Sequence, residues 1–226
     1  MKSEENESPK SKPRLNIPAG AMVIIPLRSR VLFPSMIMPV MVRRPERLHA
    51  VEETVRQQLP IGFVTQRDPN IDAPQPKDVY GVGTAADVLR MYTLPDGQRQ
   101  ILVQGRRRFE IGEFLETDPL LIARVTMVEE KIPQTKEFEA RILHLRQEAA
   151  RALSLFPEPV NELRSMIERI DDPLSVIDVI ASTLDLPSAE KQEILAILDP
   201  EARGQRDSEK LARQIELRER SRKIGE

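Results

Sequence analysis

Two periods of hydrophobic positions divide this chain, and the change falls near residue 131. Before that point, apolar runs are short and bounded by proline, glycine or charge, which is typical of β-strands. Within 120–128, for example, alternate residues form one consistently apolar face. After that point, apolar residues recur at steps of three and four, which indicates amphipathic helices. The pattern predicts a β-rich half followed by a helical half.

The first half is expected to form a closed or nearly closed barrel, because closure of short strands removes unpaired edges. The expected strands are 22–27, 36–42, 61–65, 82–94, 99–104, 108–115 and 120–128. One helix is expected at 45–58, with Pro45 in its first turn. The run Pro-Asp-Gly at 95–97 predicts a turn, since glycine accepts a positive φ there. Pro39 lacks an N–H and predicts an edge or a bulge in its strand.

The second half is expected to form a bundle of four helices. The first carries a stripe at Phe138, Ile142, Leu145, Ala149, Ala152 and Phe156. The second is expected at 160–170. Asp172 is expected to cap the third helix, with Pro173 in its first turn, and Ser188 to cap the fourth.

These patterns divide the chain into four expected parts: a disordered tail at 1–15, a barrel at 16–131, a bundle at 132–200 and a charged helix or linker at 201–226. The link near 131–134 is expected to be either a hinge or a rigid junction. Residues 207–224 are rich in Arg and Glu, and such a helix buries too little surface to be stable alone. It is interpreted either as the start of a longer helix or as an assembly element whose edge is Leu211 and Ile215.

Composition narrows the function. The chain has 226 residues, 40% of them hydrophobic and 31% charged, with a net charge of −2, so no overall field attracts it to nucleic acid or an acidic membrane. It has no cysteine, and His49 and His144 stand far apart, so no metal site is predicted. No run approaches the ~18 apolar residues that span a bilayer, and the start lacks a signal-peptide core, which predicts a cytoplasmic protein.

No catalytic motif is recognisable. The chain has no phosphate-binding loop, and the Gly81-Val82-Gly83 run lacks the rest of a dinucleotide fingerprint. Nothing marks an activated Ser-Lys pair. The chain is therefore expected to be no enzyme and to use no cofactor.

A set of short motifs, in order and spacing, resembles the amino-terminal substrate-binding domain of the Lon ATP-dependent proteases over about 22–198. The residues that carry the resemblance are Pro26, Leu27, Arg28, Val31, Leu32, Phe33, Pro34, Met36, Pro39, Arg44, Gln66, Asp68, Asp78, Tyr80, Gly83, Thr84, Ala86, Gly105, Arg108 and the run 189–195. The chain departs from the family pattern at Ser35 and Arg43, where glycine is expected.

The resemblance implies an α+β fold, with a PUA-like pseudo-barrel followed by a helical bundle. It also implies a non-catalytic domain that binds unfolded or degron-bearing client proteins through an apolar surface. In the full protease an AAA+ motor and a Ser-Lys peptidase follow, and the protease can assemble as a homo-oligomer. The client-binding candidates are Phe33, Pro34, Met36, Ile37 and Met38, where flexible methionines suit a promiscuous surface. The alternative is that these residues form ordinary core.

Two other functions stay open. One is a stand-alone Lon-domain adaptor or regulator with no protease of its own. The other is a PUA-like module that binds nucleic acid through Arg106, Arg107 and Arg108. Near-neutral charge, an aromatic content of 4% and the neighbouring Glu110 and Glu113 argue against nucleic acid and favour an internal ion pair or a solvated strand.

Overall fold

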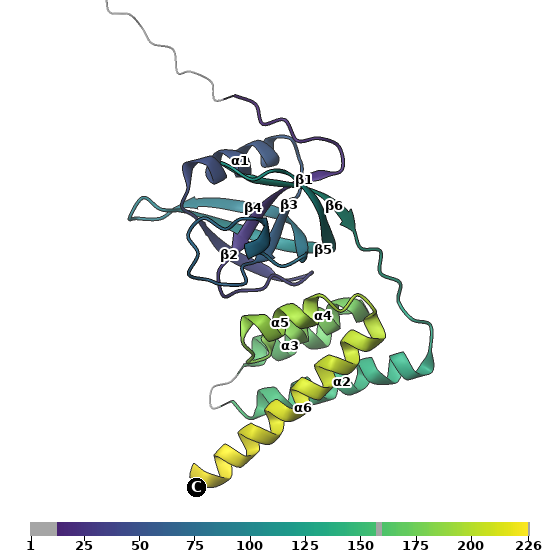
Figure 1. Cartoon of the computed structure of the whole chain (residues 1–226). Coiled ribbons are helices and arrows are strands. Elements are labelled where there is room, and N and C mark those ends of the chain that lie inside the picture. The colour runs from purple at the N-terminus through teal and green to yellow at the C-terminus, as the bar shows by residue number, and fades with distance from the viewer. Residues whose placement is uncertain (1–12, 157–159, 226) are drawn as a thin grey trace, which may run out of the picture.

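A β-barrel is stacked on a helical bundle in the computed structural model, which describes residues 13–156 and 160–225 (Figure 1). The barrel contains β1 (Ala21–Leu27), β2 (Ile37–Val42), α1 (Pro45–Arg56), β3 (Ile61–Thr65), the 3-10 turn η1 (Pro76–Asp78), β4 (Val82–Thr93), β5 (Arg99–Glu116) and β6 (Leu121–Met127). The bundle contains α2 (Lys136–Ser154), α3 (Asn161–Arg169), α4 (Pro173–Thr183), α5 (Ser188–Leu195) and α6 (Pro200–Gly225). The tail expected at 1–15 lies almost entirely outside the described residues.

The sheet closes on itself, as the sequence predicts. Its strand order is β2-β5-β4-β3-β1-β6, and β6 pairs again with β5. β1 and β3 run parallel, and the remaining pairs are antiparallel. β2 pairs with β5 alone, so it is an edge strand. This position confirms the edge predicted from Pro39.

The two strands expected at 99–104 and 108–115 are one continuous strand, and this prediction is wrong. Gly105 does not interrupt β5. Instead, it lets another segment approach the strand, since a Cβ at Gly105 would lie 2.3 Å from the carbonyl oxygen of Phe33. The turn prediction at 95–97 is confirmed, and Gly97 has a φ of 83°.

The caps of the bundle helices are partly as expected. The Asp172 carboxylate accepts a hydrogen bond of 3.0 Å from the backbone N–H of Ser175, which confirms the cap of α4. The cap predicted at Ser188 is wrong, because Ser188 is already the first residue of α5. Pro187 precedes that helix with an extended backbone and supplies no side-chain cap.

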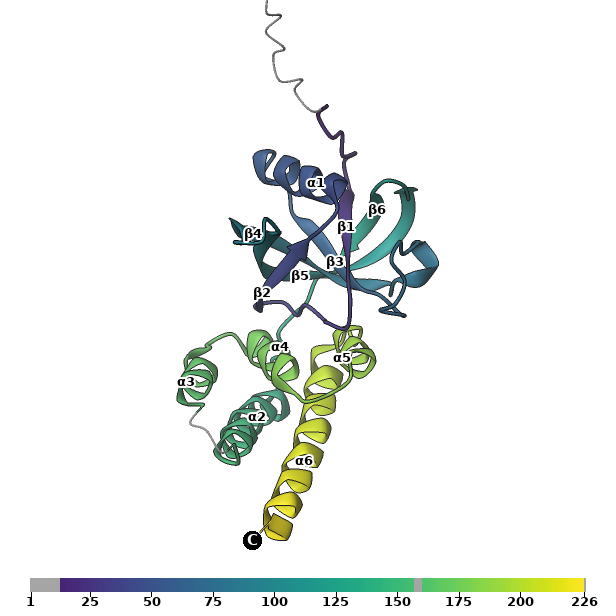
Figure 2. The same cartoon turned by 90° about the vertical axis from the view of Figure 1, so that its left-hand side faces the viewer.

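The part expected as a charged helix or linker at 201–226 is the single helix α6, which begins at Pro200 and packs along α2 (Figure 2). Four residues at every fourth position of α6 are buried: Arg203, Asp207, Leu211 and Ile215. The expectation concerned this helix alone, and in the structure the helix packs on the rest of the bundle. Two of its buried positions are charged, so an apolar stripe alone could not reveal them.

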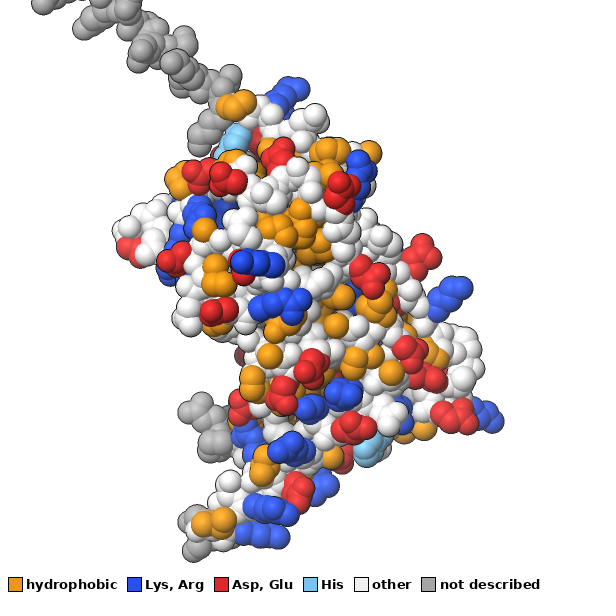
Figure 3. Space-filling model, viewed as in Figure 1, with side chains coloured by type: hydrophobic (Ala, Val, Ile, Leu, Met, Phe, Trp, Pro, Cys, Tyr) orange, Lys and Arg blue, Asp and Glu red, His pale blue; other side chains and the backbone are white. Residues whose placement is uncertain are grey.

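The hydrophobic core of the bundle extends into the barrel half of the sequence. Val31 and Phe33, which lie between β1 and β2, pack with the bundle residues, and Met36 contacts both cores. A space-filling view shows hydrophobic side chains continuing from barrel to bundle (Figure 3). The two halves therefore share packed surface in addition to the covalent link near 131–134.

Candidate client-binding face and arginine-lined pocket

The five client-binding candidates lie in different environments. Phe33 and Met38 are 0% and 2% exposed, and Pro34 is also buried. Met36 is half-buried, whereas Ile37 is 51% exposed. The structure thus places Phe33, Pro34 and Met38 in core, and of these five only Met36 and Ile37 can meet another molecule.

Ile37 belongs to an outward surface of three antiparallel strands, on which apolar residues lie among Asp87, Arg90, Gln100 and Gln104. Along β2, Met38, Val40 and Val42 point into the barrel, so the alternate residues point outward. Pro39 pairs with Leu102 of β5, and β5 pairs on its other side with β4. The surface therefore continues from β2 across β5 to β4. We call this surface the β2 face; it consists of Ile37, Pro39, Met41, Leu89, Tyr92 and Leu102. The alternation within 37–42 was the sequence signal for it.

The assembly candidates are not at the surface. Leu211 and Ile215 are each 3% exposed and pack in the bundle core. Assembly through this helix stays a prediction, but it would have to use other residues. Leu217, further along α6, is 54% exposed.

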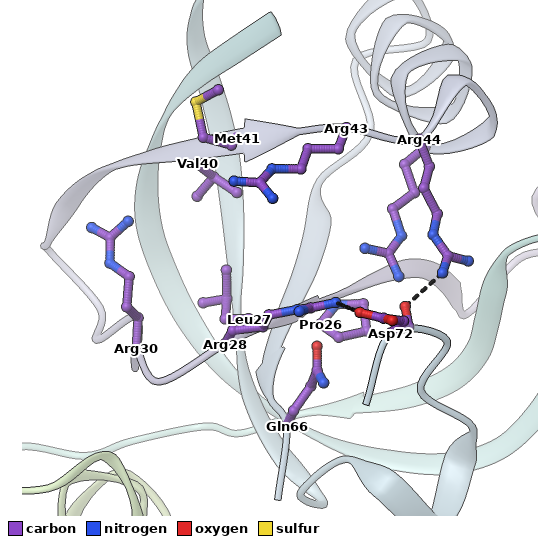
Figure 4. Close-up of a pocket in the computed structure, with 11 residues that line it drawn as sticks. Pro26, Leu27, Arg28, Arg30, Val40, Met41, Arg43, Arg44, Gln66 and Asp72 are labelled. Carbon is purple, nitrogen blue, oxygen red and sulfur yellow. Dashed lines mark hydrogen bonds and ion pairs between the residues drawn. The ribbon is translucent and has the colours of Figure 1, made fainter. Parts of the chain in front are cut away.

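An arginine-lined pocket of about 530 Å³ lies between the end of β1 and the unpaired edge of β2 (Figure 4). Its arginines are Arg28 and Arg30 from the segment after β1, and Arg43, Arg44 and Arg47 from the stretch that leads from β2 into α1. Pro26, Leu27, Val40 and Met41 form its apolar surface. The sequence analysis did not identify this site, because its arginines approach only when the strands close.

One carboxylate faces these five arginines. Asp72 forms an ion pair of 3.0 Å with Arg28, and its backbone oxygen accepts a hydrogen bond of 2.5 Å from Arg44. Arg30 donates to the backbone oxygen of Pro39 over 2.7 Å. Within residues 13–156 and 160–225, no hydrogen bond or ion pair neutralises the guanidinium groups of Arg43 and Arg47. The pocket therefore carries an excess of positive charge.

The crowding of positive charge is visible in Arg47. Burial lowers the pKa of its guanidinium, and the charges of Arg44 and Arg28 lower it further. Arg44 also precedes α1 without capping it by a side-chain hydrogen bond. The amino end of that helix adds partial positive charge on the same side.

A second polar cluster joins barrel to bundle and involves no solvent-facing pocket. Arg108 of β5 is fully buried and binds Asp178 of α4 through two hydrogen bonds of 2.5 and 3.0 Å. Its Nε donates to the backbone oxygen of Leu195 over 2.9 Å. Glu130 lies 3.4 Å from Arg108 and 2.6 Å from Arg203 of α6. We call these four charged residues and Asp207 the junction cluster.

The junction cluster is balanced if Asp207 is neutral. Burial raises the pKa of Asp207 well above its usual range, and the Asp178 charge raises it further. With Asp207 protonated, two arginines face two carboxylates. The expectation of an internal ion pair in the run 106–108 therefore holds for Arg108, while exposed Arg106 pairs with Asp87 at 2.6 Å. The signal for Asp178 was a charge within the apolar stripe of α4.

Neither a metal centre nor a membrane span is evident in the part of the chain that the structure describes. No cluster of His, Asp and Glu there has the geometry to hold an ion. No described helix is both long and apolar enough to cross a bilayer.

The order of a closed barrel followed by a helical bundle is that of a known class of domain. Residues 21–213 match the model of the ATP-dependent protease La (LON) substrate-binding domain. The chain belongs to this family, as its sequence motifs predict.

Similar proteins agree with that assignment. The Lon protease of Phenylobacterium zucineum is 39% identical over 202 residues, which cover 89% of this chain and 25% of that protein. The Lon protease of Methylocella silvestris is 36% identical over 205 residues, covering 91% and 25%. The N-terminal domain of a Mycobacterium avium complex Lon protease has the same fold, with a TM-score of 0.68 at 19% identity, covering 85% of this chain and 98% of that domain. The chain thus spans about a quarter of the length of the two Lon proteases of Phenylobacterium zucineum and Methylocella silvestris.

Proposed function

We propose that this chain captures unfolded or degron-bearing segments of client proteins on the β2 face and presents them to an AAA+ motor and protease. The observation that carries the proposal is the group of exposed apolar side chains on β2, β4 and β5 in a substrate-binding domain. Ile37, Leu89 and Tyr92 are 51%, 42% and 39% exposed. Large apolar side chains clustered at a surface favour contact with another molecule.

The chemistry of this face suits weak and promiscuous capture. Its apolar residues lie among polar ones, and Met41, with the neighbouring Met36, can change rotamer to fit different side chains. Burial of one large apolar side chain contributes about 1.5–3 kcal/mol, so a few contacts give an affinity that still allows release. The junction cluster gives the bundle a rigid attachment, through which the position of a client would be transmitted.

The test is binding of one reporter protein, presented folded and in a permanently unfolded form, followed by NMR shifts of the labelled chain. We expect the unfolded form alone to shift Ile37, Met36 and Met41. Ile37→Asp should weaken that binding roughly ten-fold, since a charge replaces one buried apolar contact.

A matched control is Leu143→Asp on α2, because Leu143 is 57% exposed and lies in the bundle. It should leave the affinity unchanged. Equal binding of folded and unfolded reporter, or equal loss in both variants, would contradict the proposal. Binding of a single-stranded oligonucleotide with a steep salt dependence would favour the nucleic-acid alternative.

A further inference from the structure

The arginine-lined pocket and the β2 face share one strand. Val40 and Met41 of β2 line the pocket, while Met41 also belongs to the β2 face. A segment that lies on the apolar face can therefore continue into the pocket without leaving β2. The edge of β2 that borders the pocket pairs with no strand in the described parts of the chain.

We propose that the pocket binds an acidic, extended peptide segment that follows or precedes the apolar segment held on the β2 face. The inference rests on the proposed function and names the class of client: polypeptides in which apolar and Asp/Glu-rich stretches adjoin. Arg43 and Arg47 supply the guanidinium groups that have no carboxylate partner among the described residues. Arg28 and Arg44 line the same pocket and both bind Asp72 (Figure 4).

Charge complementarity carries the first step. Five arginines and one carboxylate line the pocket, and that carboxylate is already engaged by Arg28. Guanidinium groups pair with carboxylates through two parallel hydrogen bonds, which are stronger than neutral ones. Carboxylates from a ligand would relieve the like-charge crowding around Arg47.

Shape favours a peptide over a compact phosphate. The volume of about 530 Å³ lies within the roughly 300–1,000 Å³ of ordinary ligand pockets. The arginines come from two separate stretches of chain, residues 28–30 and 43–47, around an apolar surface, so they suit several spaced carboxylates. At the edge of β2, Pro39 has no N–H and its backbone oxygen already accepts a hydrogen bond from Arg30, so recognition would rest on the side chains.

The experiment is fluorescence anisotropy with a labelled synthetic peptide that has an apolar half and a glutamate-rich half, and with the same peptide carrying glutamine for glutamate. The glutamate peptide should bind roughly ten-fold more tightly at low salt, and added salt should remove the difference. The double variant Arg43→Gln/Arg47→Gln should abolish the preference. Arg169→Gln, an exposed arginine of α3, is the matched control and should retain it.

A second variant changes the affinity in the opposite direction. Asp72→Asn removes the pocket carboxylate and releases Arg28, so the glutamate peptide should bind several-fold more tightly. A merely structural role of the pocket would not produce a gain. An unchanged or weaker affinity in this variant would count against the proposal.

Competition separates the possible anions. If the two peptides bind equally and inorganic triphosphate displaces the glutamate peptide, the pocket is assigned to phosphate and the inference is overturned.

The variants distinguish failure of the inference from failure of the proposed function. If Ile37→Asp weakens both peptides but the arginine variants show no change in preference, the pocket inference fails and the proposed function stands. If the arginine variants lose the preference but Ile37→Asp binds normally, the pocket stands and the role of the β2 face fails.

Discussion

Ser35 has a left-handed backbone, with a φ of 68°, beside the junction of barrel and bundle. A side chain in this conformation costs about 1 kcal/mol, which is why glycine is expected there. The serine hydroxyl compensates by a hydrogen bond of 2.8 Å to the hydroxyl of Ser175 on α4. The departure from the family motif therefore exchanges backbone freedom for a contact between the two halves.

At this residue we expect glycine to be tolerated better than alanine. Ser35→Ala keeps the backbone strain and loses the hydrogen bond, so it should lower the free energy of unfolding by about 1 kcal/mol. Ser35→Gly loses the same bond but relieves the strain, so its net change should be close to zero. Urea denaturation of both variants checks the order; an alanine variant as stable as the glycine variant would contradict it.

At the scale of an element, α6 shows how a helix with few apolar residues is held in place. Its buried side at Arg203, Asp207, Leu211 and Ile215 is half polar, and the two polar residues belong to the junction cluster. Arg203 also donates to the backbone oxygen of Ile197 over 2.7 Å. Further along, Arg218 stacks on Phe156, with its guanidinium carbon 3.9 Å from the ring centre. The helix is therefore stabilised by tertiary contacts along its length.

Asp207 should make the stability of the protein depend on pH. Because the folded state raises its pKa, the folded chain holds a proton that the unfolded chain releases near pH ~4. Its contribution to stability is complete below that pH and is lost as pH rises through the folded pKa. Asp207→Asn removes this dependence. As pH rises, the free energy of unfolding should therefore fall in the parent but not in the variant, and the difference between them should grow in favour of the variant. Denaturation at a series of pH values measures the difference; parallel curves would refute it.

For the whole molecule, the barrel and the bundle behave as one packed body because they share core and charge. Phe33 packs with the bundle, and Arg108 reaches from β5 to α4. Gln192 of α5 donates to the backbone oxygen of Val82 over 3.0 Å. These contacts join residues that lie far apart in the sequence and connect the barrel to the bundle.

Removing one charge from the junction cluster should destabilise both halves together. Asp178→Ala leaves Arg108 and Arg203 with one fewer buried partner, and we expect a loss of about 3–5 kcal/mol. The matched control is Asp87→Ala, which breaks the half-exposed pair with Arg106 and should cost less than about 1 kcal/mol. Hydrogen exchange should show reduced protection in barrel and bundle alike. Loss confined to the bundle would show that the halves unfold independently.

Local patterns anticipated much of this fold. Strand alternation, the glycine turn at 95–97 and the Asp172 cap act within a few residues, so they are legible in the sequence and are confirmed. The continuous β5 was missed because Gly105 reads as a break, although its role is to admit the chain at Phe33. Among the client-binding candidates, the structure separates the exposed Ile37 and the half-buried Met36 from the three core residues. The sequence could not make this distinction, because it does not say which side of β2 faces the barrel.

The sequence by itself determined the class of domain, the two periodic halves and the edge position of Pro39, because periodicity, proline geometry and short motifs are properties of neighbouring residues. Only the tertiary structure decided where charge would be buried and where it would gather. Arg108 meets Asp178, and Arg28 meets Arg47, only after the barrel closes and the bundle packs against it. Electrostatic energy depends on distances in space and on exclusion of water, and neither is encoded at any single position in the chain.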